Sequence, residues 1–236
     1  MNSSSQPLEA PVAPALLLNS QAAKISMIGS RAFLIDAPGD FDLPAQRRIW
    51  ALSKALHGHT LVEELVPGMT NLLVVLQRTP ADPQAVIDEL QQAWRQVQEL
   101  DRPGRLIEIP TCYGGEHAID LAAICDFSGL PAAEVIRRHH RATYTVFAIA
   151  SAPGFGYLGG LDPTIYMPRK KVPSLNMLKG MVTIGGMQSG LSVLDGPNGW
   201  NALGFADMPM FDPYADVPAT LAPGDTVRFL PERIEL

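Results

Sequence analysis

Residues 151–163 read Ser-Ala-Pro-Gly-Phe-Gly-Tyr-Leu-Gly-Gly-Leu-Asp-Pro, and this stretch decides how the second half of the chain is interpreted. Because it holds four glycines and two prolines, we expect no regular secondary structure across it. A backbone this bare can approach a ligand or a partner closely. Two interpretations remain open: a binding loop that presents Phe155 and Tyr157, or a tight barrel corner with both rings in the core.

The segments on either side of this stretch predict a small β-barrel. Downstream, short apolar runs alternate with Gly and Pro turns as far as a strand expected at 226–230, a pattern typical of barrels built from short strands. Upstream, we expect a short strand at 106–109 and a longer one at 144–150. Two helices, 117–125 and 131–140, are expected between these strands.

The first part of the chain predicts a compact α/β sandwich. Asp82 is a good helix N-cap, Pro83 suits the first helical position, and apolar residues recur at helical spacing up to Leu100. The run Leu-Leu-Val-Val-Leu at 72–76 is apolar on both faces, so we expect a central strand that is covered on both sides. We expect this central strand at 71–77 and the other strands at 24–28, 31–35 and 61–66. A further helix is expected at 43–57.

The predicted fold class is therefore α+β, with an N-terminal α/β sandwich domain followed by a C-terminal β-barrel. The run Asp-Arg-Pro-Gly-Arg at 101–105 interrupts the pattern and marks the expected boundary. We divide the chain into a flexible tail at 1–21, an N-terminal domain at 22–102 and a barrel domain at 103–236. The tail has no basic segment ahead of its apolar residues, so we do not expect a signal peptide.

The composition excludes some classes of function. Acidic residues outnumber basic ones by 24 to 18 and the pI is near 5.3, whereas a nucleic-acid-binding surface requires a basic face. No apolar run reaches the length of a membrane span, so we expect a cytoplasmic protein that binds neither nucleic acid nor membrane. The basic run at 137–141 is either a solvated helix end or a contact surface for an acidic partner.

Several catalytic motifs are absent from the sequence. There is no Gly-x4-Gly-Lys-Ser/Thr loop, so the chain carries no P-loop for ATP. The run Gly-Met-Gln-Ser-Gly at 186–190 places its serine one position too late for a nucleophile elbow. We expect Cys112 and Cys125 to be reduced, packed thiols and His57 with His59 to be a surface pair, so we predict no metal site.

A few polar residues remain as candidates for a binding site. The guanidinium of Arg169 could hold a carboxylate at two points, although a solvated loop also explains it. Gln188 and Ser189 could hydrogen-bond an amide or a lactam, or they could belong to a β-turn. His139 could act as an acid or a base, but at a helix end it could instead be a structural hydrogen-bonding group.

Short motifs occur along the chain in a characteristic order and spacing: Gly29–Ala32, Asn71–Val74, Thr111–Gly115, Glu134–Ile136 with His139, Pro153–Phe155, Tyr157–Leu161, Pro168–Arg169, Gln188–Gly190 and Gly199–Trp200. Together they resemble the family of the 5-oxoprolinase B subunit, also called allophanate hydrolase subunit 1, to which an inhibitor of a sporulation histidine kinase is related. The resemblance covers nearly the whole chain after about residue 22. Its most specific part is Pro-Gly-Phe followed by Tyr-Leu-Gly-Gly-Leu.

The resemblance implies a cyclophilin-like form for the C-terminal barrel. It also implies that the chain acts with two kinds of 5-oxoprolinase partner, C-like and A-like subunits, to open 5-oxo-L-proline to L-glutamate, and that it is inactive alone. ATP is expected to bind the assembled complex. In this scheme the candidate catalytic residue is His139, and the expected substrate-binding residues are Pro153, Gly154, Phe155, Tyr157, Gly159, Gly160, Arg169, Gln188 and Ser189. Arg169 would hold the carboxylate, Gln188 the lactam, and the two aromatic rings would exclude water.

The chain also departs from the family pattern. Ser-Leu-Asn-Met-Leu-Lys-Gly at 174–180 lacks the arginines and the second proline usual in this segment. If those arginines bind an anionic substrate, this chain is a paralogue with another substrate or with a structural role. Two further functions remain open: a non-catalytic regulator that inhibits a histidine kinase, and a subunit for allophanate or urea breakdown.

Overall fold

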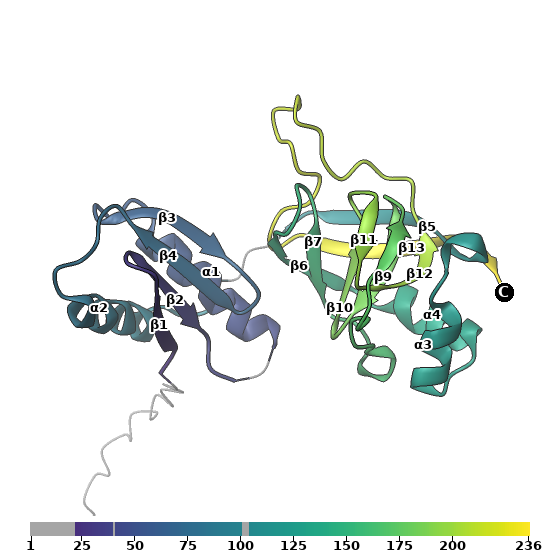
Figure 1. Cartoon of the computed structure of the whole chain (residues 1–236), viewed down its shortest axis with the longest axis horizontal. Coiled ribbons are helices and arrows are strands. Elements are labelled where there is room, and N and C mark those ends of the chain that lie inside the picture. The colour runs from purple at the N-terminus through teal and green to yellow at the C-terminus, as the bar shows by residue number, and fades with distance from the viewer. Residues whose placement is uncertain (1–21, 40, 101–103) are drawn as a thin grey trace, which may run out of the picture.

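A computed structural model of the chain describes residues 22–39, 41–100 and 104–236. The tail expected at 1–21 and the junction at 101–103 lie outside these residues, so the domain boundaries stay a prediction. The described residues form a four-stranded sheet with two helices and, further along, a closed barrel with two more helices (Figure 1). This architecture confirms the predicted α+β class. None of the described helices is long and apolar enough to cross a membrane.

The N-terminal unit is an antiparallel sheet with the strand order β1-β2-β4-β3. Both of its helices pack against one face (Figure 1). Its strands are β1 (Lys24–Ile28), β2 (Ala32–Asp36), β3 (Val62–Pro67) and β4 (Asn71–Leu76), and its helices are α1 (Leu43–Leu56) and α2 (Pro83–Gln96). The four strands and α1 agree closely with the ranges expected from the sequence.

Helix α2 begins where the sequence predicts and ends early. The side chain of Asp82 accepts hydrogen bonds from backbone amides of the first turn, which have no partner within the helix. The helix ends at Gln96 rather than at the expected Leu100, because Val97 adopts an extended backbone conformation (φ −81°, ψ 137°). Apolar spacing alone therefore overestimated the length of this helix.

Strand β4 lies in the interior of the sheet, as expected, between β2 and β3. Leu72 and Val74 are fully buried against the helices, whereas Leu73 and Val75 on the opposite face are only half-buried. The expectation that both faces are covered is wrong, since among the described elements both helices of this unit lie on one face. An apolar run marks a central strand but does not reveal which faces are covered.

The barrel has the strand order β10-β7-β6-β13-β5-β12-β9. It is closed by β13, which pairs in parallel with β5 and antiparallel with β6, so that the end of the chain joins its middle. Helices α3 and α4 lie together at one end (Figure 1). The barrel strands are β5 (Leu106–Gly114), β6 (Tyr144–Ile149), β7 (Gly156–Gly159), β9 (Met181–Gly185), β10 (Gln188–Leu191), β12 (Asn201–Phe205) and β13 (Thr226–Glu235). A separate two-stranded ribbon pairs β8 (Ser174–Met177) with β11 (Gly196–Asn198). The helices are α3 (Leu121–Ser128) and α4 (Ala132–Arg141), and there are 3-10 turns at Gly115–His117 and Pro163–Ile165.

The glycine-rich stretch at 151–163 contains regular structure, contrary to expectation. Its middle forms strand β7, which pairs with β6 and β10. Glycine is required within this strand because a Cβ on Gly159 would lie 2.6 Å from the ring of Phe147. Here the absence of a side chain serves packing against a neighbouring strand, which composition alone could not distinguish from an open loop.

Strand β5 and the helix after it also differ from the expected ranges. The strand continues past Ile109 to Gly114, because β13 runs beside it over its whole length. The helix expected from His117 begins at Leu121 and is preceded by a 3-10 turn. Gly114 and Gly115 both have positive φ angles (76° and 63°) and form the corner between the strand and this turn.

Helix α1 connects the two units through buried hydrogen bonds. The backbone carbonyl of Phe147 in β6 accepts from Nε2 of Gln46 at 3.2 Å and from Nε1 of Trp50 at 3.1 Å. Oε1 of Gln46, which is fully buried, accepts from the amide of Thr70 at 2.6 Å. One glutamine therefore links α1, the β3–β4 turn and the barrel.

Candidate functional site

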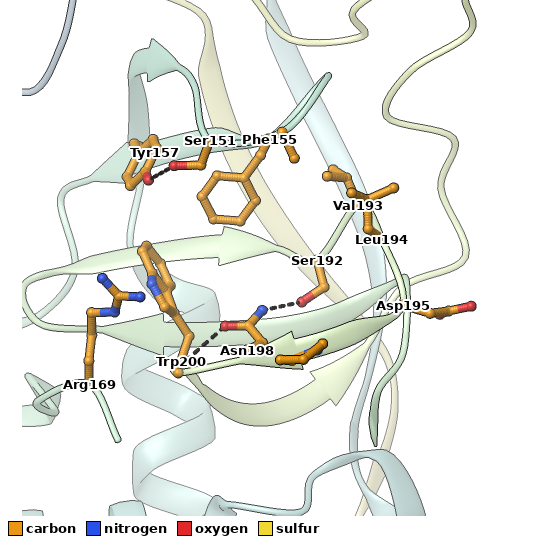
Figure 2. Close-up of a pocket in the computed structure, with 13 residues that line it drawn as sticks. Ser151, Phe155, Tyr157, Arg169, Ser192, Val193, Leu194, Asp195, Asn198 and Trp200 are labelled. Atoms are coloured by element: carbon orange, nitrogen blue, oxygen red, sulfur yellow. Dashed lines mark hydrogen bonds between the residues drawn. The ribbon is translucent and has the colours of Figure 1, made fainter. Parts of the chain in front are cut away.

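A cavity of about 400 Å³ lies on the barrel beside the glycine-rich stretch. It is bounded by the segments 151–157 and 192–200 and by Arg169 (Figure 2). Phe155, Tyr157 and Arg169 from the expected binding set line it, and Trp200 and Asn198 line it as well. The structure therefore brings three expected residues together and adds others.

Three aromatic rings form one wall of the cavity. The ring of Phe155 meets Tyr157 edge to face at a centroid distance of 4.9 Å and meets Trp200 at 5.4 Å. Tyr157 and Trp200 are 5.9 Å apart. Phe155 and Trp200 are 8% and 6% exposed, and Tyr157 is half-buried. Edge-to-face packing fixes the orientation of such rings, so this wall is rigid and suits a small, flat ligand.

The polar groups of the cavity are mostly held by neighbours. The hydroxyls of Ser151 and Tyr157 share a hydrogen bond, and Ser151 has a positive φ of 65°, a conformation that a non-glycine residue rarely adopts. Nδ2 of Asn198 donates to Oγ of Ser192 at 3.1 Å, and its Oδ1 accepts from the amide of Trp200 at 2.9 Å (Figure 2). These groups can bind a ligand without first reorganising.

Arg169 is held in place by the residues on either side of it. The carbonyl of Pro168 accepts from Nδ2 of the buried Asn201 at 2.9 Å. The amide of Lys170 donates to the carbonyl of Gly199 at 2.7 Å, and its Nζ forms a 2.6 Å ion pair with Asp120. By contrast, the exposed guanidinium of Arg169 has no hydrogen-bond or ion-pair partner among the described residues. The backbone is fixed and the charge is available to a ligand.

His139 and Ser189 lie apart from the cavity, in the barrel core. Both are fully buried, and Nε2 of His139 lies 2.8 Å from Oγ of Ser189. Nδ1 of the same imidazole lies 2.7 Å from the hydroxyl of Tyr113. Burial lowers the pKa of His139 to about 3, and the nearby His140 acts in the same direction. A neutral imidazole enclosed in this way packs α4 onto the barrel and has no access to a ligand in the cavity.

Gln188 precedes Ser189 in strand β10 and is half-buried. Successive side chains of a strand point to opposite faces, so Gln188 points away from the core that holds Ser189. It is nevertheless not among the residues that line the cavity. Asn198 is therefore the amide placed to meet a ligand there.

The remaining residues of the expected set act through the backbone. Gly154 has a φ of +80°, and a Cβ on it would lie 2.4 Å from the carbonyl oxygen of Met210. Gly160 has a φ of +109°, and a Cβ there would lie 2.6 Å from the carbonyl oxygen of Thr143. Pro153 is exposed. None of these three residues lines the cavity.

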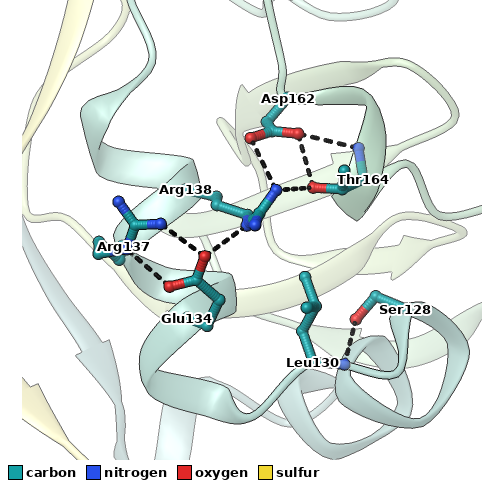
Figure 3. A network of polar contacts seen from close by, with 7 residues as sticks. All are labelled: Ser128, Leu130, Glu134, Arg137, Arg138, Asp162 and Thr164. Atoms are coloured by element: carbon teal, nitrogen blue, oxygen red, sulfur yellow. Dashed lines mark hydrogen bonds and ion pairs between the residues drawn. The ribbon is translucent and has the colours of Figure 1, made fainter.

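Gly160 instead borders a second, open cleft at the C-terminal end of α4, near Arg137, Arg138 and Asp162. Both arginines form ion pairs with Glu134 (Figure 3). Their hydrogen bonds, that of Arg137 first, lower the pKa of Glu134 to about 2. Arg138 also lies 3.4 Å from Asp162. Because carboxylates already hold these two guanidiniums, the basic run offers less free charge than its sequence indicates.

Neither a triphosphate nor a metal matches the side chains of the cavity. Its charged residues are Arg169 and Asp195, which balance each other, whereas a triphosphate is usually held by several cations and backbone donors. Among the described residues no group of three or more His, Cys, Asp or Glu side chains could hold a metal ion. The cavity fits a small ligand with one anionic group and a flat, weakly polar body.

Comparisons with known proteins identify the family of the chain. Residues 23–221 match the family described as "Carboxyltransferase domain, subdomain C and D", so the class is that of a barrel-containing carboxyltransferase-type domain. The chain is 37% identical over 213 residues to the B subunit of 5-oxoprolinase from Escherichia coli O157:H7, covering 90% of this chain and 98% of that protein. The chain belongs to the 5-oxoprolinase B-subunit family, and the resemblance found in the sequence is confirmed.

Solved structures share the fold. The crystal structure of TTHA0988 superposes with a TM-score of 0.69 at 30% identity, covering 86% of this chain and 40% of that one. Urea carboxylase of Kluyveromyces lactis superposes with a TM-score of 0.75 at 19% identity, covering 89% of this chain and 22% of that one. At this lower identity the likeness concerns the fold alone.

Proposed function

We propose that this chain is a subunit of an ATP-dependent 5-oxoprolinase-type amidohydrolase, which opens 5-oxo-L-proline to L-glutamate and is active only with C-like and A-like partner subunits in the cytoplasm. The observation that carries the proposal is the cavity in which an unpartnered Arg169 lies beside an aromatic wall, in a chain whose relatives are named as B subunits of 5-oxoprolinase. 5-Oxoproline is a flat five-membered lactam with one carboxylate, and it matches this combination of groups.

Each part of the substrate has a partner in the cavity. Arg169 binds the carboxylate, since a guanidinium can donate two parallel hydrogen bonds to it. The ring of the lactam lies against Phe155 and Trp200, and these side chains exclude water. Asn198, rather than the expected Gln188, meets the amide edge, because Asn198 lines the cavity and Gln188 does not.

The need for partners follows from the chemistry. A lactam carbonyl is a weak electrophile, and transfer of the γ-phosphoryl group of ATP to its oxygen, with release of ADP, would make the carbonyl carbon more electrophilic. Water would then add to this carbon and the C–N bond would break to give an acyl phosphate, from which a second water releases phosphate and glutamate. The cavity lacks the cations that a triphosphate requires, so ATP binds elsewhere in the complex. This chain then orients the substrate and presents its carbonyl to groups supplied by a partner.

The experiment that tests this proposal measures ATP-dependent release of glutamate from 5-oxoproline. The chain is assayed alone, mixed with the A-like and C-like subunits of the same organism, and in the mixture as Arg169→Ala. We expect activity in the mixture alone and a KM raised about tenfold or more by the substitution. Lys171→Ala is the matched control, since Lys171 is exposed and does not line the cavity. A mixture that forms a complex but hydrolyses no 5-oxoproline would refute the substrate assignment.

A further inference from the structure

A loop between β12 and β13, which we call the 207–218 arm, projects away from the barrel (Figure 1). Its base is anchored, because Met210 is buried in the barrel core and its carbonyl accepts from the amide of Thr220 at 3.0 Å. Further out, the amide of Asp212 donates to the carbonyl of Pro218 at 2.8 Å. The arm is therefore held in one shape by its own hydrogen bonds.

The end of the arm exposes apolar side chains to the surface of the described structure. Tyr214 is 95% exposed, Val217 is 72% exposed and Phe211 is 38% exposed. The amide of Tyr214 donates to Oδ1 of Asp212 at 2.9 Å, which fixes the backbone beneath the ring. Tyrosine is enriched among the residues that dominate binding energy at interfaces, and a preformed arm loses little conformational entropy when it binds.

All the charged side chains of the arm are acidic. Asp207, Asp212 and Asp216 are exposed, and the sequence from 206 to 227 contains no Lys, Arg or His. No ion pair between these carboxylates and a described residue is present in the structure. A partner of complementary potential must therefore carry basic residues around an apolar pocket.

The base of the arm touches the segment that lines the cavity. A Cβ on Gly154 would lie 2.4 Å from the carbonyl oxygen of Met210 and 2.9 Å from Cβ of Phe211. Gly154 lies between Ala152 and Phe155, both of which line the cavity. The base of the arm therefore lies next to the candidate site.

We propose that the 207–218 arm docks into a partner subunit of the complex, with Tyr214 and Val217 entering an apolar pocket that Lys and Arg residues border. The proposal rests on the proposed function, in that the partner is a subunit of the same enzyme. Docking at this position places the partner's surface beside the cavity, and this explains how one site can be shared between two chains.

The test measures the affinity of the full chain for its purified A-like and C-like partners by surface plasmon resonance. Tyr214→Ala should weaken binding tenfold or more, because it removes the central anchor without disturbing the core. Asp216→Lys should slow association at least tenfold at low salt and by less at high salt. The matched controls are Phe127→Ala and Asp126→Lys, which change an exposed aromatic ring and an exposed carboxylate on α3, at the far end of the barrel from the arm.

The outcomes separate this proposal from the proposed function. An active complex that tolerates Tyr214→Ala and Asp216→Lys with unchanged affinity overturns the arm proposal alone. If the wild-type chain binds neither partner and the mixture is inactive, both proposals fail. If the chain self-associates by sedimentation velocity and Tyr214→Ala abolishes this association while partner binding is unchanged, the arm binds a second copy and the proposal is overturned.

Discussion

Nε2 of His139 lies 2.8 Å from Oγ of Ser189, and this contact joins helix α4 to strand β10 inside the barrel. Oγ of Ser189 also donates to the carbonyl of Thr183 at 3.1 Å. Because the hydroxyl proton of Ser189 is used in that bond, Nε2 of His139 must carry the proton that it donates to Oγ. Nδ1 then accepts from the hydroxyl of Tyr113 at 2.7 Å. The neutral imidazole therefore satisfies the polar groups around it. A second proton, on Nδ1, would point at the hydroxyl proton that Tyr113 donates.

The first prediction is that His139 makes the protein sensitive to mild acid. Its pKa is lowered by burial from 6.5 to about 3 in the folded state. Between these pH values the unfolded chain binds a proton that the folded chain excludes, so the free energy of unfolding falls as pH falls, by at most about 1.4 kcal/mol per pH unit. Urea unfolding of wild type and His139→Gln from pH 7 to pH 4 measures this slope.

The variant should be less stable than wild type at pH 7 by about 1–3 kcal/mol, because Tyr113 and Ser189 lose a buried partner. The gap between the two proteins should narrow steadily below pH 6.5. His57→Gln serves as the control, since His57 is exposed, and its curve should run parallel to that of wild type. Equal slopes for wild type and His139→Gln would show that His139 does not cause the loss of stability.

The second prediction concerns the glycine that faces the Phe147 ring. A Cβ on Gly159 would lie 2.6 Å from Cε1 and Cζ of Phe147, a side chain that is only 4% exposed and has little room to move. Gly159→Ala should therefore lower the free energy of unfolding by about 1–3 kcal/mol through overpacking. In Gly199→Ala the new methyl group would meet its nearest neighbour at 3.6 Å, so thermal unfolding of this control should differ little from wild type.

The sequence predicted the elements better than the site because the two depend on different information. Helix and strand periodicity is local, and the cap at Asp82 and the apolar run in β4 were sufficient to place their elements. The parallel pairing of β13 with β5 joins segments more than a hundred residues apart. Nothing within Leu106–Ile109 revealed that this strand would continue as far as Gly114.

The candidate site shows the same limit. Phe155, Tyr157 and Arg169 were predicted from residue type and do meet at one cavity. Gln188 and Ser189 are adjacent in sequence, yet strand alternation directs them to opposite faces. Trp200 and Asn198 were not predicted as binding residues, because their position depends on the ribbon that β11 forms with β8. The run Asp-Gly-Pro-Asn-Gly-Trp at 195–200 was the available signal, as a polar turn that ends in an aromatic residue.

The third prediction concerns the link between the two units. Gln46 is fully buried, and it bonds the carbonyls of Gly68 and Phe147 as well as the amide of Thr70. Gln46→Met keeps the volume but leaves these groups without a partner, so we expect the free energy of unfolding to fall by about 2 kcal/mol or more. Gln92→Met on the exposed side of α2 is the matched control. Equal midpoints in urea for both variants would mean that this link does not stabilise the chain.

The last prediction tests whether Lys170 acts by positioning Arg169. The 2.6 Å ion pair between Lys170 and Asp120 is largely buried, and Asp120 also accepts from the amide of Ala202 at 2.8 Å. Lys170→Met removes one of the three contacts that hold the backbone around Arg169, so this backbone should become more mobile. We expect the KM of the assembled enzyme for 5-oxoproline to rise by about threefold to tenfold with little change in kcat, since the lost interaction orients the substrate carboxylate.

A double-mutant cycle separates positioning from a general loss of structure. If Lys170 acts only through Arg169, Lys170→Met should raise KM in the wild-type background and leave it unchanged in the Arg169→Ala background. Asp120→Asn combined with Lys170→Met removes the unpaired buried carboxylate, and it should restore thermal stability without restoring KM. If Lys170→Met raised KM by the same factor in both backgrounds, Lys170 would act independently of Arg169. In that case the ion pair would matter to the substrate by some route other than the guanidinium beside it.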